Sequence, residues 1–234
     1  MSAHTGPILE GRGESDYERY VRVPELLELQ KPVALLAHPE ERLFQTTHQT
    51  AELWLHHVDY EITRATKHVA ADEPELASAL LERCTRILHL LREQIVILET
   101  MAPADYHVIR TSSLGKGSGQ ESPGFAILLR VGKKLWPVFA ALLETRQLTL
   151  VEIEREPGRD VSMFRLVQAM LDYDQAFLGW RFTHMRLAFR IIGSKVMSLK
   201  GVPASQLEMG IREPLFPLLW ETISELTAEH QPGY

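Results

Sequence analysis

Apolar residues recur every three or four positions through several long segments of the chain, a spacing that lines one face of an α-helix. No segment alternates apolar and polar residues with the period of two that a half-buried strand requires. The pattern therefore predicts an all-α fold, a helical bundle of four main long helices plus short helices. Long helices are expected over residues 39–70, 74–101, 123–146 and 161–195, and shorter ones over 24–29, 103–110 and from Pro214 onward.

Proline and charged residues set the predicted boundaries of these helices. Pro39 suits a first helical turn, and Glu40 and Glu41 complement the N-terminal dipole of the same helix. Pro137 predicts a kink within the third long helix. Residues 152–160 are charged and contain Pro157-Gly158, which predicts a linker. The second helix is expected to bury one stripe formed by Leu76, Leu80, Cys84, Ile87, Leu91 and Leu98.

The first residues differ in composition from the rest of the chain. Residues 1–15 are mostly small and polar, with no apolar core of the kind that a signal peptide carries. We therefore expect a flexible N-terminal arm over 1–15 and a single all-helical domain over 16–234.

Composition excludes several classes of protein. The 234 residues are 45% hydrophobic, which allows a sizeable core, and the formal net charge of -6 argues against non-specific nucleic-acid binding. Cys84 is the sole cysteine, so no disulfide can form within the chain, and the cytoplasm is the expected compartment. No apolar run approaches the length of a membrane span, so no membrane association is expected.

Two histidines are candidates for iron ligation. His184 and His48 both lie in long predicted helices, and an imidazole on each of two facing helices could form the two sides of a haem pocket. Periodicity alone does not favour His184 over His89 or His56. A single cysteine excludes c-type attachment, so any haem would be held by histidine and packing.

Other polar residues leave alternatives open. His48, Glu52 and His56 share one helix face and could bind a metal without haem, although the paired Glu-x-x-His motifs of di-iron bundles are absent. Tyr106 and Arg110 are four residues apart, and Arg110 could either bind a carboxylate or cap its helix.

Two further sequence features carry no predicted chemistry. Residues 114–119 are glycine-rich but lack the features of a phosphate-binding loop. Cys84 lies on an apolar stripe and is expected in the core.

Five segments in collinear order resemble the tryptophan 2,3-dioxygenase family of haem enzymes. They include a Tyr-x-x-Tyr motif near the N-terminus, a His-Gln-x-x-Glu-Leu-Trp-like motif, a Tyr-x-x-x-Arg segment followed by a Gly/Ser loop, and a Trp-Arg-Phe-x-His-Met-Arg helix. A Leu-Phe-Pro tail completes the series. In this chain the segments begin at Tyr17, Phe44, Leu98, Trp180 and Leu215.

The resemblance implies haem b as cofactor, O2 as co-substrate and a role for each matching residue. His184 would bind the iron, and Trp180, Ser118 and Gly119 would contact the haem. His48 would be the distal histidine near the indole nitrogen. The substrate, a tryptophan-like amino acid, would be bound by Phe44, Tyr106, Arg110, Ser198, and by Tyr17 and Tyr20 of a neighbouring subunit in a homotetramer or homodimer that exchanges N-terminal segments.

Departures from the family pattern leave the reaction open. The family's glycine-rich loop after the proximal helix is replaced by residues 197–203, and the chain lacks several dozen residues that the family carries between Glu144 and Val161. The resemblance implies oxygen insertion at the indole C2/C3 of L-tryptophan or a close derivative such as β-methyltryptophan. Ring-opening dioxygenation to an N-formylkynurenine and monooxygenation to a 2-oxindole are equally compatible with it. A non-catalytic haem-based gas sensor or carrier, and a haem-free helical bundle, are the alternatives.

Overall fold

The computed structural model describes residues 9–115, 117, 119–194, 208 and 210–230, and this part of the chain is helical without a strand. The all-α prediction is confirmed. Within these ranges, no helix has the length and apolar character needed to cross a membrane. The α-helices are α1 (Asp16–Val21), α2 (Val23–Glu28), α3 (Glu41–Ala70), α4 (Pro74–Leu98), α5 (Pro103–Ser112), α6 (Pro123–Leu128), α7 (Val131–Arg146), α8 (Leu150–Arg155), α9 (Val161–Ile192) and α11 (Pro217–His230), and the short 3-10 helices are η1 (Val33–Leu35) and η2 (Gly119–Glu121).

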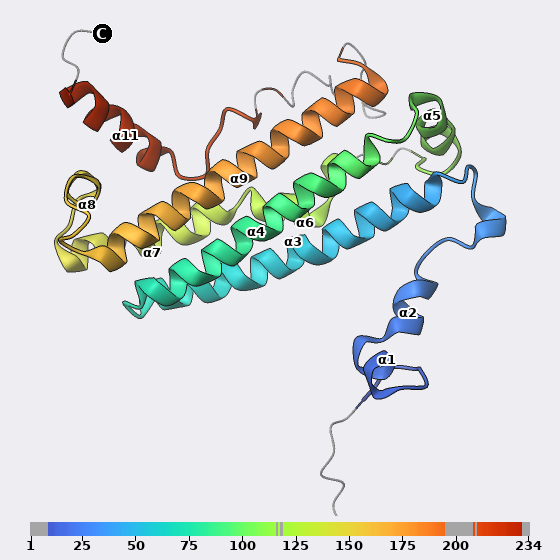
Figure 1. Ribbon diagram of the computed structural model, residues 1–234, viewed down its shortest axis with the longest axis horizontal. Coiled ribbons are helices and arrows are strands. Elements are labelled where there is room, and N and C mark those ends of the chain that lie inside the picture. Colours follow the sequence, from blue (N-terminus) through green and yellow to red (C-terminus); the bar gives the residue numbers. More distant parts are fainter. Residues whose placement is uncertain (1–8, 116, 118, 195–207, 209, 231–234) are drawn as a thin grey trace, which may run out of the picture.

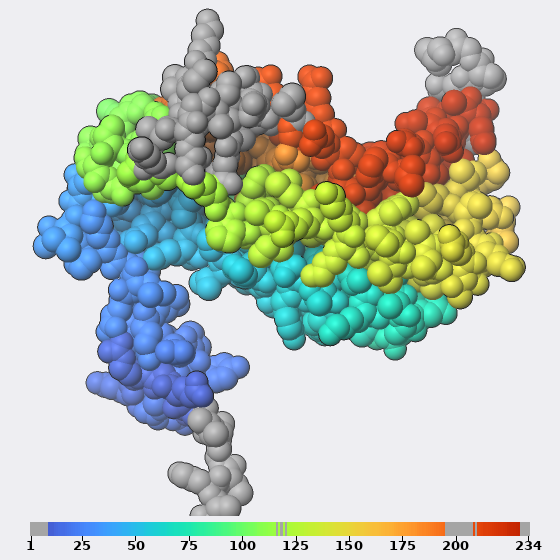
Figure 2. Space-filling model, turned by 180° about the vertical axis from the view of Figure 1, so that it is seen from behind, coloured from blue at the N-terminus to red at the C-terminus, as the bar shows by residue number. Residues whose placement is uncertain are grey.

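The core lies between α3, α4 and α9, three long helices that run side by side (Figure 1). Each contributes apolar residues at three-to-four spacing, such as Leu55, Val58 and Ile62 of α3. α6 and α7 also pack against α3, and Figure 2 shows them in front of it. Cys84 is buried in this core as predicted, and burial raises the pKa of its thiol to about 12.

The predicted stripe of α4 is right except at its first residue. Leu80, Cys84 and the later members are buried, but Leu76 is 52% exposed. A helix has 3.6 residues per turn, so a stripe with a seven-residue repeat drifts around its axis. At the start of α4 the buried face is formed by Ala77 and Leu81 instead.

The prediction of one continuous helix over 123–146 is wrong. The helix breaks at Leu129–Arg130, and α7 continues through Pro137. Separate tertiary contacts are made on the two sides of the break. Glu52 binds the start of α6, whereas Gly132 in α7 lies so close to the Leu215 carbonyl that an added Cβ would meet it at 2.2 Å.

The prediction of a linker over 152–160 is also wrong in its first half. α8 occupies Leu150–Arg155, and its N-terminus has a capping box in which Thr149 and Glu152 satisfy each other's backbone amides. Ile153 is buried against the core, which fixes the helix to the bundle. The charged residues of α8 are compatible with a helix because one buried residue and a cap are enough to anchor six residues.

The remaining boundaries differ by a few residues from those predicted. α3 starts at Glu41 rather than Pro39, α4 ends at Leu98, and α9 ends at Ile192 where Gly193 adopts a positive φ of 86°. The last helix begins at Pro217 rather than Pro214.

α1 and α2 stand away from the bundle (Figures 1 and 2). Their apolar residues stay exposed, including Tyr17 at 71% and Tyr20 at 77%. The segment after α2 is bound to α3, because Gln49 donates to the Leu29 carbonyl at 3.2 Å and Gln45 accepts from the Lys31 amide at 2.8 Å. The division into a 1–15 arm and a 16–234 domain stays a prediction.

Asp174 of α9 fixes the C-terminal segment to the bundle. Its side chain is fully buried and accepts hydrogen bonds from the Leu215 amide at 2.9 Å, the Phe216 amide at 3.0 Å and the Trp220 indole at 3.0 Å. These three donors satisfy the buried carboxylate, which would otherwise lack the hydrogen bonds that it makes to water in the unfolded chain. The start of α11 is thereby set against the middle of α9.

We predict that Asp174→Ala lowers the free energy of unfolding by about 3 kcal/mol, because it leaves one buried and two part-buried donors without an acceptor. Chemical denaturation measures this change. Asp172→Ala is the matched control, since Asp172 is an exposed residue of the same helix. An equal effect of both substitutions would contradict the prediction.

Candidate active site

The fold brings together His48 of α3 and His184 of α9, which are far apart in sequence. Burial lowers the pKa of the His184 ring to about 4, and the nearby His48 adds to this shift because two positive charges would repel each other. Burial likewise lowers the pKa of His48, against the opposing effects of the Phe44 carbonyl and Glu52. Both imidazoles are therefore neutral near pH 7.

Trp180 and Gly119 lie beside the ring of His184. The ring stacks on Trp180, with 6.4 Å between centroids and 27° between planes. An added Cβ at Gly119 would lie 3.8 Å from His184 Nε2, so this predicted contact residue faces the ring. Within the part of the chain that the structure describes, no hydrogen bond to either nitrogen of His184 is formed.

The tautomer of His48 is set by its own helix. Its Nδ1 lies 2.7 Å from the Phe44 carbonyl oxygen, which can only accept, so Nδ1 carries the proton and donates it. The lone pair therefore resides on Nε2. The Phe44 ring packs against the imidazole at 4.0 Å between centroids, which restricts rotation of both side chains.

α5 carries Tyr106 and Arg110, and it places the ring of Tyr106 near that of Phe44. The Tyr106 ring lies 5.9 Å from that of Phe44, and burial raises the pKa of its hydroxyl while nearby Arg110 lowers it. The phenol is therefore protonated and can donate a hydrogen bond. Arg110 lies one turn later on the same helix, in its last turn.

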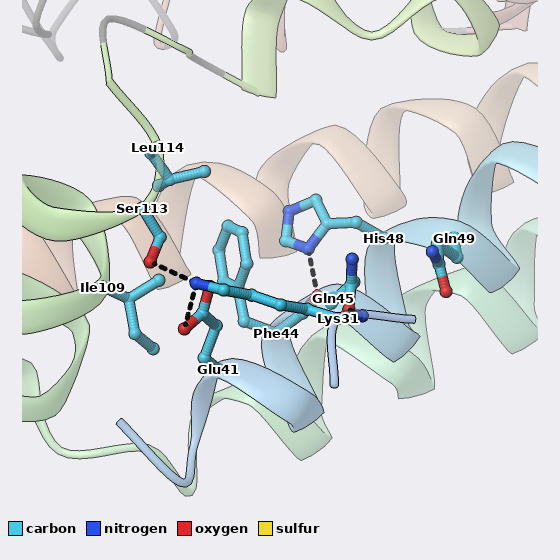
Figure 3. Close-up of a pocket in the computed structure, with 9 residues that line it drawn as sticks. All are labelled: Lys31, Glu41, Phe44, Gln45, His48, Gln49, Ile109, Ser113 and Leu114. Atoms are coloured by element: carbon cyan, nitrogen blue, oxygen red, sulfur yellow. Dashed lines mark hydrogen bonds and ion pairs between the residues drawn. The ribbon is translucent and has the colours of Figure 1, made fainter. Parts of the chain in front are cut away.

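A cavity of about 400 Å³ opens beside His48 (Figure 3). Seven of its nine lining residues were not predicted from the sequence as site residues, although three of them follow from the periodicity of α3. Positions 41, 45 and 49 share a helix face with Phe44 and His48. The cavity is lined by Lys31, Glu41, Phe44, Gln45, His48, Gln49, Ile109, Ser113 and Leu114.

The structure does not place four of the predicted substrate or haem contacts at this site. Tyr17 and Tyr20 are exposed on α1, outside the bundle of their own chain. Ser118 and Ser198 lie outside the described residues.

Glu52 holds the start of α6 and is not part of a metal cluster. Its carboxylate accepts from the Gly124 amide at 3.0 Å and from the Ser122 hydroxyl, while His56 is exposed to solvent. Among the described residues, no group of three histidine, cysteine or acidic side chains could hold a metal ion. The alternative of a haem-free metal site on α3 is therefore wrong for the described part of the chain.

The donor set does suit a haem. Iron in a haem needs one axial nitrogen from the protein, and a neutral His184, which has no competing hydrogen bond among the described residues, offers it. The aromatic rings of Trp180 and Phe44 and the small Gly119 suit the flat apolar macrocycle. The chemistry of these residues therefore fits a b-type haem.

Comparison with known proteins agrees with this chemistry. The family model for tryptophan 2,3-dioxygenase matches residues 1–135, more than half of the chain. A tryptophan 2,3-dioxygenase from Saccharopolyspora erythraea is 29% identical over 266 aligned positions, covering 92% of this chain and 94% of the relative. The alignment is longer than the 234 residues of this chain, so the relative carries additional internal residues.

Two further relatives have the same name. Tryptophan 2,3-dioxygenase from Caulobacter vibrioides is 29% identical, covering 90% of this chain and 98% of the relative. The enzyme from Xanthomonas oryzae pv. oryzae is 26% identical, covering 96% and 91%. The chain thus belongs to the tryptophan 2,3-dioxygenase family of haem-dependent oxidoreductases, which use O2 as co-substrate.

Proposed function

We propose that this protein inserts oxygen from O2 at the indole C2–C3 bond of L-tryptophan or a close derivative. The observation that carries the proposal is the meeting of His48, with its lone pair on Nε2, and a neutral His184 in one half-buried site. A tryptophan-like substrate fits the family.

In this proposal His184 holds the haem iron. Its pKa near 4 means that no proton competes for the nitrogen lone pair at neutral pH. Trp180 supports the ring by stacking, and Gly119 leaves room on the side of Nε2. When bound, the haem supplies ferrous iron that activates O2. Ser118 is proposed to contact the haem from its sequence position beside Gly119.

His48 orients the indole. With Nδ1–H donated to the Phe44 carbonyl, Nε2 is free to accept a hydrogen bond from the indole N–H. Phe44 would form a wall of the indole pocket, since its ring packs on that of His48. Burial disfavours the imidazolium that proton removal would produce, so the role proposed for His48 is orientation of the ring rather than obligatory proton removal.

Arg110 and Tyr106 bind the amino-acid end of the substrate. A guanidinium can form two parallel hydrogen bonds to a carboxylate, and a protonated phenol can add a third. Holding both ends of the substrate reduces the entropic cost of the reaction. Ser198, whose hydroxyl stands where the family has a threonine, is proposed to contact the same end.

The exposed helix α1 suggests an interaction with a second copy of the chain. Tyr17 and Tyr20 expose most of their surface on α1, away from the site of their own chain. We propose that they cover the substrate pocket of a neighbouring subunit in a homotetramer or homodimer. We also propose the cytoplasm as the compartment, because Cys84 is a free, buried thiol.

Two reaction outcomes have separate support. The names of the relatives favour dioxygenation to an N-formylkynurenine. The replacement of glycines in residues 197–203, beside the proposed amino-acid end, favours monooxygenation of a bulkier substrate such as β-methyltryptophan. A gas sensor or carrier has no use for the carboxylate-binding pair on α5, so it is the weaker alternative.

We predict that His184→Ala abolishes the Soret band of the purified protein, because the axial nitrogen is lost. Absorbance spectroscopy after reconstitution with haem measures this. His89→Ala, a change at an exposed histidine of α4, should leave the band intact. A full Soret band in His184→Ala would refute the assignment of the iron ligand.

We predict that ferrous protein converts L-tryptophan or β-methyltryptophan to a product with one or two additional oxygen atoms. Mass spectrometry with isotopically labelled O2 reads out the chemistry: two inserted atoms indicate dioxygenation and one indicates the oxindole route. If neither substrate is consumed, the proposed function is wrong.

A further inference from the structure

α5 carries Tyr106 and Arg110 but is weakly held by apolar packing. Of its ten residues only Ile109 is buried. A helix of this length is marginal in water without tertiary support. The position of the two binding residues therefore depends on other contacts of α5.

Polar contacts connect both ends of α5 to the segment that precedes α3. At the first turn, Asp105 lies 3.5 Å from His38 Nε2. At the other end, the Lys31 ammonium donates to the hydroxyl of Ser113, the C-cap residue, at 3.2 Å. In Figure 3 the Lys31 side chain extends along the cavity to reach Ser113 and Glu41. A cation at this end also complements the helix dipole.

Lys31 is itself fixed relative to α3. Its ammonium lies 3.0 and 3.3 Å from the two carboxylate oxygens of the buried Glu41. Burial would raise the pKa of Glu41, but hydrogen bonds from Lys31 and from the Ala37 amide at 2.7 Å keep it below its ordinary value. The Lys31 backbone is bound as well, by Gln45 at 2.8 Å and by Arg42 at 3.1 Å.

We propose that Lys31, oriented by Glu41, is a positioning residue for the substrate's carboxylate. It links α3, which carries His48, to the end of α5, where Arg110 lies three residues before Ser113. The distance between α3 and α5 then decides where the indole lies when the carboxylate is bound. This inference rests on the proposed function, because it takes Arg110 as the carboxylate ligand.

The first test is a double-mutant cycle in the haem-loaded enzyme. Lys31→Met retains the aliphatic stem and should raise KM for L-tryptophan about tenfold, with kcat within about twofold, because small misplacements of a binding group are costly. In an Arg110→Met background the same change should have no further effect on KM. Additive effects, or a fall in kcat with unchanged KM, would overturn the proposal.

The second test needs no substrate. Amide hydrogen exchange of residues 103–114 should become faster in Lys31→Met and in Ser113→Ala, the latter leaving the ion pair with Glu41 intact. Lys31→Met leaves the buried Glu41 carboxylate without its partner. The double change Lys31→Met/Glu41→Gln removes that unpaired charge and should also make the exchange of residues 103–114 faster. Lys134→Met is the control, since Lys134 pairs with Asp59 at 2.9 Å and has a similar exposure, 35% against 31% for Lys31.

The two tests separate the possible failures. Unchanged exchange in α5 overturns the positioning role even if Arg110→Met raises KM. If Arg110→Met leaves KM unchanged, the proposed carboxylate ligand is wrong, and with it the functional part of the present proposal, whatever the exchange rates. Faster exchange in Lys134→Met as well would indicate general loosening and would also overturn it.

Discussion

The packing of α3 and α9 in one core with α4 is the constraint on which the site depends. Their apolar faces must be removed from water, and this fixes the direction and rotation of both helices. His48 and His184 are carried along by this packing, and the same burial keeps both rings neutral. Core formation and the chemistry of the candidate haem ligand therefore have one physical origin.

Much of the fold could be predicted from periodicity, because the long apolar stripes of α3, α4 and α9 identify nearly the whole length of each helix. The errors occurred where tertiary contacts override local signals. Pro137 did not break α7, whereas a break that no proline marks lies seven residues earlier, at Arg130, between two helices that make separate tertiary contacts. The charged segment at 152–160 hid the buried Ile153, since one apolar residue gives no periodicity.

The candidate site was only partly predictable. Motifs pointed to His48, Arg110 and His184, and the fold places the two histidines close together. Lys31 and Ser113 could not be found, because their relation depends on a contact between residues 82 positions apart. Glu41 was interpreted as a helix-dipole residue, and its main contact is a part-buried ion pair with Lys31 that only the path of the preceding chain reveals.

The anchor at Asp174 has a consequence for divergence within the family. α9 ends at Ile192, and Asp174 of the same helix binds the chain again at Leu215, so both ends of the segment between them are fixed to one helix. The entropic cost of joining two fixed points changes only slowly with the length of the connection. The composition and length of this segment can therefore vary at little cost to the helices. Substitutions or insertions there can accumulate while the helices that carry His48 and His184 stay unchanged.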